Sequence, residues 1–237
     1  MTDSSTASAE AVFATKSDLA YTRVRALILS GDLEPGAVLP QAALARTIGM
    51  STTPLREALR RLKQEGLVEL DAHRDARVRP LDGTEARDLL ELRRNLEPLA
   101  ADLAAQRRTE TEIAALQDAL GRLEALPANP SLAQLESHQR FHAAIHRASH
   151  NALLVEMLDG IWVKTDRYRR HALEGGRTDE ERDARAVEHR LLFEAVRDGD
   201  AAAAADLMRR HVESSLGARS VAQLAEPVAT DPTGAPR

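Results

Sequence analysis

The stretch LARTIGMSTTPLREALRRLKQEGLVEL, residues 44–70, predicts two short helices joined by a tight turn and followed by the first strand of a β-hairpin. Gly49 predicts the end of the first helix, because glycine readily takes the left-handed backbone that such a stop requires. Ser51 is suited to cap the second helix, and Pro54 falls in its first turn, where no amide donor is lost. The second helix then carries an apolar stripe made of Leu55, Leu59 and Leu62.

A short helix, a turn and a second helix that begins with small hydroxyl residues and continues with arginines are typical of a helix-turn-helix that enters the major groove of DNA. Gly66 predicts the end of the second helix. Apolar residues beyond it predict two strands around a polar tip, a wing, at Leu67, Val68, Leu70 and Val78. Residues 16–80 are therefore predicted to form a winged helix-turn-helix domain that binds DNA.

The composition is that of a helical protein with two domains. The chain has 237 residues, of which 43% are hydrophobic and only 3% aromatic, so its core consists mainly of Leu, Ala and Val. No apolar run approaches the roughly 20 residues of a membrane span, and the N-terminus lacks the pattern of a signal peptide. The absence of cysteine excludes disulfides and thiolate metal sites, and it fits a cytoplasmic protein.

The net charge of −5 is unevenly distributed along the chain. Residues 1–80 contain 11 Lys and Arg against 10 Asp and Glu, whereas the remainder contains 21 against 27. Affinity for phosphate depends on the local positive face, so a nearly neutral head on an acidic body remains compatible with binding to a duplex. We expect weak non-specific binding to DNA.

The chain beyond the wing is predicted to be an all-α antiparallel bundle over residues 84–216, so that the protein is mainly α. Apolar residues at helical spacing indicate six helices, the first of them capped by Thr84. These segments span residues 89–103, 113–123, 132–145, 153–168, 187–196 and 201–216. The Ser/Thr/Ala-rich residues 1–15 and the Ala/Pro/Thr-rich residues 217–237 are predicted to be disordered tails.

From residue 17 to residue 216 the chain resembles the GntR family of bacterial transcription regulators, in the FadR branch, whose effector domain is called FCD. The matching segments are ILSGDLEPGAVLP, ALAxxIGMSTTPLREALRRLKQEGLVE, ELRRNLEPLAADLAA, QRFHAAIHRASHN, EHRLLFEAVRDGD and MRRHV. The resemblance implies a homodimer that binds a pseudo-palindromic DNA operator. It also implies that a small effector in the helical domain changes the affinity for the operator.

The resemblance implies DNA contacts by Ser51, Thr53 and Arg56, with Thr52 and Arg60 as further candidates on the same helix. The wing candidates are His73, Arg74 and Arg77. The alternative for the helix arginines, including Arg61, is that they are merely solvated. Thr52 stands where the family commonly has arginine, Ala42 where it often has arginine or glutamate, and Asp75 where it has a wing-tip glycine. These departures indicate an unusual operator sequence.

Histidines form a second group of candidate residues. His138 and His142 are four residues apart, so both imidazoles project from one helix face and can share an ion. By resemblance, the metal ligands are His138, His142, His189 and His211, with His138 in the place of the family's usual aspartate. Four neutral imidazoles favour zinc, nickel or copper over manganese, and we expect zinc or nickel. The alternatives are that His138 does not bind the ion or that histidines spaced by four residues, such as His146, serve only packing.

Arg93 and Asn151 are the candidate effector-binding residues. The resemblance implies that Arg93 holds a carboxylate of the effector, a task that suits the bidentate guanidinium. The alternative for Arg93 is an ion pair with Glu97, one helical turn away. The alternative for Asn151 is a cap on the following helix.

The preferred hypothesis is a transcription regulator, a repressor, whose operator affinity responds to a small organic acid bound near the metal. The first alternative is a regulator for which the metal ion itself is the effector. The second is a metal-dependent enzyme, which requires an open coordination position. Four histidines would close a tetrahedral site, and the sequence has no recognisable nucleophile–base pair, phosphate loop or paired catalytic carboxylates, so we expect no enzymatic activity.

Overall fold

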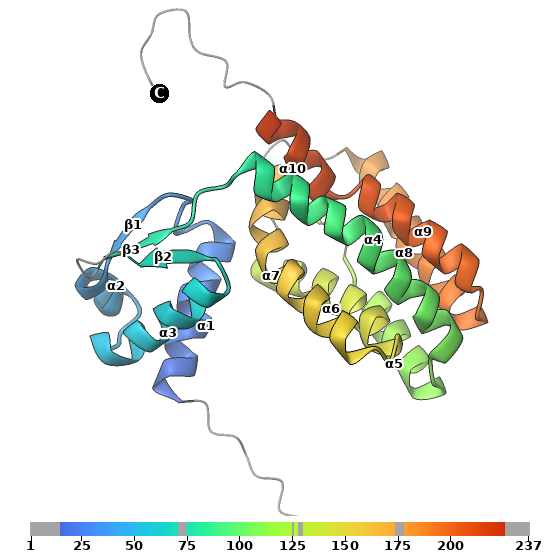
Figure 1. The fold of residues 1–237 in the computed structure, drawn as a ribbon, viewed down its shortest axis with the longest axis horizontal. Helices are drawn as coiled ribbons and strands as arrows, with labels where there is room; N and C mark the ends of the chain where they lie inside the picture. Colours follow the sequence, from blue (N-terminus) through green and yellow to red (C-terminus); the bar gives the residue numbers. More distant parts are fainter. Residues whose placement is uncertain (1–14, 71–74, 125, 128–129, 174–177, 226–237) are drawn as a thin grey trace, which may run out of the picture.

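The computed structural model describes residues 15–70, 75–124, 126–127, 130–173 and 178–225, which form a small N-terminal head beside a larger helical bundle (Figure 1). The predicted architecture, a winged helix-turn-helix followed by an all-α bundle, is confirmed. Of the N-terminal tail predicted for residues 1–15, residues 1–14 lie outside the described residues, as do residues 226–237, while Thr15 is ordered as the N-cap of the first helix. Among the described residues, no helix is both long and apolar enough to cross a membrane.

In its described residues, the head consists of three helices and a three-stranded antiparallel sheet of order β1-β3-β2. Its core is built by the α3 stripe that the sequence predicts, since the side chains of Leu55, Leu59 and Leu62 are fully buried. Strand β1, whose Val38 lies opposite Arg77, is an addition to the two predicted strands. The elements are α1 (Lys16–Ser30), β1 (Val38–Pro40), α2 (Gln41–Thr47), α3 (Thr52–Gln64), β2 (Val68–Leu70) and β3 (Asp75–Val78).

The bundle is built around the long helix α4, which packs against α6, α7, α8, α9 and α10. Helix α4 is capped by Asp82, whose Oδ1 accepts a hydrogen bond from the Glu85 amide at 2.8 Å, so the predicted Thr84 cap is wrong. The aspartate is favoured because it lies one residue before the helix, where its carboxylate can reach the free amides. The helices are α4 (Gly83–Arg107), α5 (Glu110–Gly121), α6 (Leu132–Ala148), α7 (Ala152–Leu173), α8 (Asp179–Asp198), α9 (Ala201–Glu213) and α10 (Leu216–Ala225).

Helix α10 corrects the prediction that disorder begins at residue 217. The chain turns at Ser214 and Ser215 and forms this extra helix, which packs against α4 and α7 (Figure 1). Leu216 is buried at its start, while Val221 and Leu224 pack against the apolar cluster around Tyr168. The helix is short and rich in small residues, so it depends on this tertiary packing rather than on its own propensity.

We predict that Leu216→Ala lowers the free energy of unfolding by about 2–5 kcal/mol, because it removes a buried side chain from a close-packed contact. Leu216 is 4% exposed and packs in a cluster with Leu135 and Leu173. Urea unfolding followed by circular dichroism measures the change. The matched control is Leu19→Ala, at a leucine that is 43% exposed, for which the expected change is within about 0.5 kcal/mol. Equal losses in the two variants would contradict the packing of α10.

Candidate functional site

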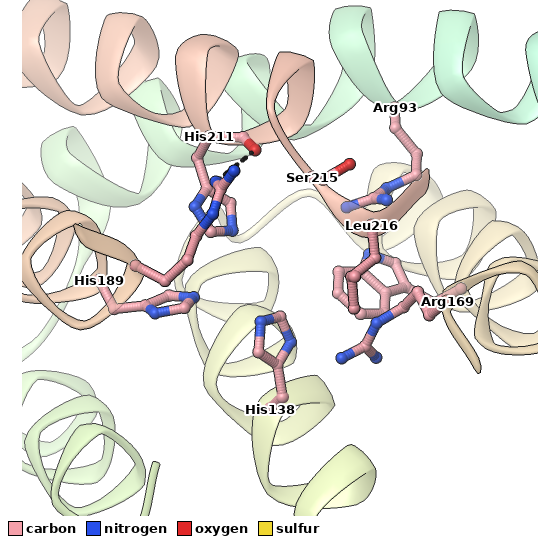
Figure 2. Close-up of a pocket in the computed structure, with 9 residues that line it drawn as sticks. Arg93, His138, Arg169, His189, His211, Ser215 and Leu216 are labelled. Carbon is pink, nitrogen blue, oxygen red and sulfur yellow. Dashed lines mark hydrogen bonds between the residues drawn. The ribbon is translucent and has the colours of Figure 1, made fainter. Parts of the chain in front are cut away.

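Four histidines from three helices meet inside the bundle. Figure 2 shows three of them, His138, His189 and His211. His138 and His142 come from α6, and their ring centroids are 4.8 Å apart. His189 of α8 and His211 of α9 complete the group, with their centroids 4.7 Å apart. One nitrogen from each of the four rings lies within 4.8 Å of the others, a separation that one shared ion can span. The structure therefore brings together all four predicted metal ligands.

The ring nitrogens of these histidines are suited to a metal ion. His138 Nδ1, both nitrogens of His142 and His189 Nε2 are buried without a hydrogen-bond partner among the described residues. Buried polar atoms in folded proteins are nearly always satisfied, so such a group of unpaired nitrogens points to a missing ligand. His211 Nδ1 lies 2.9 Å from Glu188 Oε2, a contact that orients the ring and leaves its other nitrogen for an ion.

The surroundings keep these imidazoles neutral, as metal ligation requires. Burial holds the pKa values of His142 and His189 well below the ordinary value, and any proton on a neighbouring histidine would lower them further. Burial of the ring nitrogens and the Arg169 charge do the same for the pKa of His138. Burial also lowers the pKa of His211, although its contact with Glu188 opposes the shift. The site can therefore bind a metal ion at neutral pH without first releasing protons.

We predict that the metal-free protein loses stability as the pH falls below about 6.5, the ordinary pKa of histidine. Below that value the unfolded chain binds protons at these histidines while the folded chain does not, so protonation favours unfolding. At one pH unit below 6.5 the loss is up to about 1.4 kcal/mol for each histidine that stays neutral. Urea unfolding in the presence of chelator at pH 7.5 and pH 5.5 measures it. Equal stability at both pH values would contradict the prediction.

A carboxylate and a fifth histidine extend this group, and the sequence alone did not reveal them. Glu97 and His146 are fully buried and form a second potential ligand set with His142. Glu97 Oε2 lies 3.7 Å from His142 Nδ1 and has no hydrogen-bond partner among the described residues. His146 was expected to serve packing rather than to bind a ligand. It lies four residues after His142 on the same face of α6, and its side chain is buried in the core. His150, by contrast, is exposed and pairs with Glu112.

The cavity beside the histidines is lined by arginines, and Figure 2 shows Arg93 and Arg169 on the side opposite His189. Arg93 is buried, and its Nε donates a hydrogen bond to Glu97 Oε1 at 2.5 Å, so the predicted ion pair exists. Because Arg93 also lines the cavity, the pairing with Glu97 and the role as an effector residue are compatible. Sequence reasoning missed the other lining residues, which are Trp162, Arg169, Arg185, Ser215 and Leu216.

Asn151 does not belong to this site. Its Oδ1 accepts a hydrogen bond from the Leu154 amide at 3.2 Å at the start of α7, and the residue is not part of the cavity wall. This hydrogen bond supports the capping alternative, and the effector role of Asn151 stays a prediction. An asparagine immediately before a helix satisfies an amide that would otherwise lack a partner.

The second helix of the motif, α3, presents its N-terminal residues to solvent. Ser51, Thr53, Arg56 and Arg60 are exposed, and Thr52 is half-buried. Arg56 Nε donates to Gln41 Oε1 of α2 at 3.0 Å, which holds the guanidinium at the surface. Ser51 occupies the N-cap position, although its side chain makes no capping hydrogen bond. These side chains are available to a duplex.

The remaining DNA candidates differ in their surroundings. Arg77 is exposed on β3, and its Nη1 donates to the Gly36 carbonyl at 2.7 Å. The wing-tip residues His73 and Arg74 lie outside the described residues. Arg61 points toward α1, where it pairs with Asp18 at 2.6 Å and lies over the ring of Tyr21.

Family models match both parts of the chain. The model for bacterial regulatory proteins of the gntR family matches residues 16–78, and the FCD domain model matches residues 88–214. The chain belongs to the GntR family. It carries the FCD type of helical domain, and α10 lies outside the matched part of this GntR protein.

Curated relatives and solved structures agree with this assignment. The GntR chain is 31% identical over 206 residues to the HTH-type transcriptional regulator LutR of Bacillus subtilis, covering 78% of this chain and 93% of LutR. It is 27% identical to the uncharacterized HTH-type transcriptional regulator YdhC of the same organism, a match that covers 60% of this chain and 64% of YdhC. The structure of E. coli McbR/YncC has the same fold, with a TM-score of 0.72 at 24% identity over 89% of this chain and 97% of that one.

Proposed function

We propose that this GntR protein is a DNA-binding transcriptional repressor whose affinity for a pseudo-palindromic operator is changed by a small carboxylate bound beside a metal ion. The exposed N-terminal half of α3 carries the DNA-binding part of the proposal, because Thr53 and Arg56 are free to reach a duplex. A recognition helix reads base edges with the residues of its first turns. The relatives named above are transcriptional regulators rather than enzymes, which supports the same class.

The metal part of the proposal depends on the histidine cluster. We expect His138, His142, His189 and His211 to hold one zinc or nickel ion, because four neutral imidazoles, three of them with unpaired buried nitrogens, match the preference of these ions. The bound ion would supply a positive charge that attracts an anion to the cavity. Glu188 lies behind His211 and orients its ring, and Glu97 lies 3.7 Å from Nδ1 of His142.

The effector part depends on the cavity. Arg93 faces it together with Ser215, and a carboxylate there would find both a guanidinium and the charge of the metal ion. Such charge-assisted hydrogen bonds are among the stronger contacts in proteins. A metal-responsive regulator, in which the ion alone is the effector, stays the second candidate, since the histidine cluster is complete without any organic ligand.

We further propose that two copies of the chain form a homodimer through α4 and α7. These two helices pack together and leave large apolar side chains in solvent: Leu92, Leu99, Leu153 and Met157, which are 45%, 44%, 74% and 54% exposed. Exposed apolar residues gathered on one face are typical of an interface. A two-fold dimer would place two heads on the two halves of a pseudo-palindromic site.

Capture of genomic DNA fragments by the purified full chain tests the proposed function, because it identifies the operator. Its affinity is then measured by fluorescence anisotropy with zinc, with chelator, and with zinc plus a panel of small organic acids. A response to acids in the presence of zinc supports the preferred form, whereas a response to chelator alone supports the metal-responsive form. Affinity must fall steeply as the salt concentration rises. Failure to enrich any fragment would contradict the proposal.

A further inference from the structure

A second buried arginine faces the cavity and has a donor to spare. Arg169 of α7 is 2% exposed and lines the cavity with Arg93 and the histidines (Figure 2). Its Nη1 donates to Asp166 Oδ1 at 3.0 Å, while its Nη2 is buried without a hydrogen-bond partner among the described residues. A buried cationic donor left unsatisfied is costly, so this nitrogen indicates an acceptor that is supplied from outside the chain.

The position of Arg169 within the cavity fits an anion. The guanidinium carbons of Arg169 and Arg93 lie 5.2 and 4.8 Å from the ring centroid of Trp162, so one indole supports both cations. A guanidinium held against an aromatic ring presents its own planar fork of donors to carboxylate oxygens. As it stands, the cavity has room for about one water molecule, so a bound acid group would have to shift the Arg169 side chain.

The partner of Arg169 connects the cavity to the DNA-binding head. Asp166 is buried, and its second oxygen, Oδ2, lies 3.7 Å from Arg25 Nη2. Arg25 belongs to α1, which packs directly against α3. A single carboxylate is thus shared between a cation of the cavity and a cation of the head.

Neighbouring residues of α7 hold the linker between the two domains. Arg167 Nη1 donates to the Arg79 carbonyl at 2.7 Å, immediately after β3. Tyr168 donates its hydroxyl to Glu85 at 2.6 Å near the start of α4. The segment 166–169 therefore contacts the cavity, the head and the linker. A shift of Arg169 would change the contacts of this segment with all three.

We propose that Arg169 is a ligand anchor, binding the acid group of the effector through Nη2, and that the Asp166–Arg25 pair transmits this event to the head. The proposal rests on the proposed function, since it assigns the anion of the same cavity. An anion at Arg169 competes with Asp166 for the guanidinium, and the other ion-pair partner of Asp166 among the described residues is Arg25. Ligand binding then strengthens the contact between α7 and α1 and fixes the head relative to the bundle, which is the differential interaction that allostery requires.

Malonate, a small dicarboxylate, is the probe for the anchor. Its binding to the full chain loaded with zinc is followed by the fluorescence of Trp162, the sole tryptophan. We expect Arg169→Lys, which keeps the charge beside Asp166 but removes the planar fork, to raise the Kd for malonate about 10-fold or more. The matched control is Arg170→Lys, at the next residue, which contacts Gly31 of the head and does not line the cavity; its Kd should stay within about twofold of the wild type. An unchanged Kd in Arg169→Lys would overturn the anchor.

The Asp166–Arg25 pair is tested with Arg25→Gln, which lies in the head and leaves the cavity intact. We expect malonate to bind this variant as it binds the wild type, while the effect of malonate on operator affinity, about 5- to 150-fold for coupling of this kind, disappears. Lys16→Gln, at an exposed position of the same helix, should keep the effect. A full effect in Arg25→Gln would overturn the transmission step alone. Absence of any malonate effect in the wild type would contradict both this inference and the carboxylate part of the proposed function.

Discussion

Arg56→Ala is expected to weaken binding to the operator about 5- to 150-fold, the equivalent of losing one specific base contact worth about 1–3 kcal/mol. Arg56 is exposed one turn into α3, and Gln41 of α2 holds its guanidinium at the surface. Because the side chain contributes nothing to the core, its removal should leave the stability of the head unchanged. Fluorescence anisotropy with the captured operator, at one fixed salt concentration, gives the ratio of Kd values.

The matched control is Arg61→Ala on the same helix. Arg61 pairs with Asp18 and lies over Tyr21, so it faces α1 rather than a duplex, and we expect its loss to change operator affinity less than about threefold. The salt dependence separates the two ways in which Arg56 can contact DNA. Loss of a phosphate contact lowers the slope against salt by about 0.9, whereas loss of a base contact leaves it unchanged and relaxes sequence preference. Equal effects of the two substitutions would contradict the assigned orientation of α3.

The head could be predicted from the sequence because its decisive features are local. Gly49 and Gly66 both adopt positive φ, at 66° and 75°, where the sequence predicts the ends of the two helices. The stripe of α3 leucines has one helical period and is buried as that period requires. Strand β1 was missed because a strand of three residues is stabilised by its pairing with β3 and has no pattern of its own.

The candidate site could be predicted only in part. The spacing of His138 and His142 on one helix is visible in the sequence, but their meeting with His189 and His211 depends on how three helices pack. The burial of Arg169 could not be predicted from the sequence, because a run of charged residues on a helix usually faces solvent. It is buried because α7 lies between the cavity and α1, and this tertiary arrangement has no counterpart in the local pattern.

His142→Ala is expected to abolish the stabilisation of the protein by zinc. An ion that binds only the folded chain stabilises it by about 4 kcal/mol when its free concentration is 1,000 times its Kd. We expect that a site without His142, one of its four predicted ligands, no longer holds the ion at that concentration. His142 is fully buried and lies among the other three predicted ligands, and neither of its nitrogens has a hydrogen-bond partner among the described residues. The measurement is the difference in Tm between samples with zinc and with chelator, together with the zinc content of the dialysed protein.

Comparing the Tm with zinc and with chelator within each variant separates metal binding from the loss of stability caused by the cavity that alanine leaves in the core. The matched control is His150→Ala, eight residues further along the chain and beyond the end of α6, where the side chain is exposed and pairs with Glu112. This variant should retain the full zinc effect. Retention of one tightly bound zinc by the His142 variant would contradict the assignment of this residue.

His138→Asp should keep the site but shift its preference toward harder ions such as manganese, because a carboxylate replaces an imidazole. The two variants therefore distinguish a ligand that the site requires from one that sets its choice of metal.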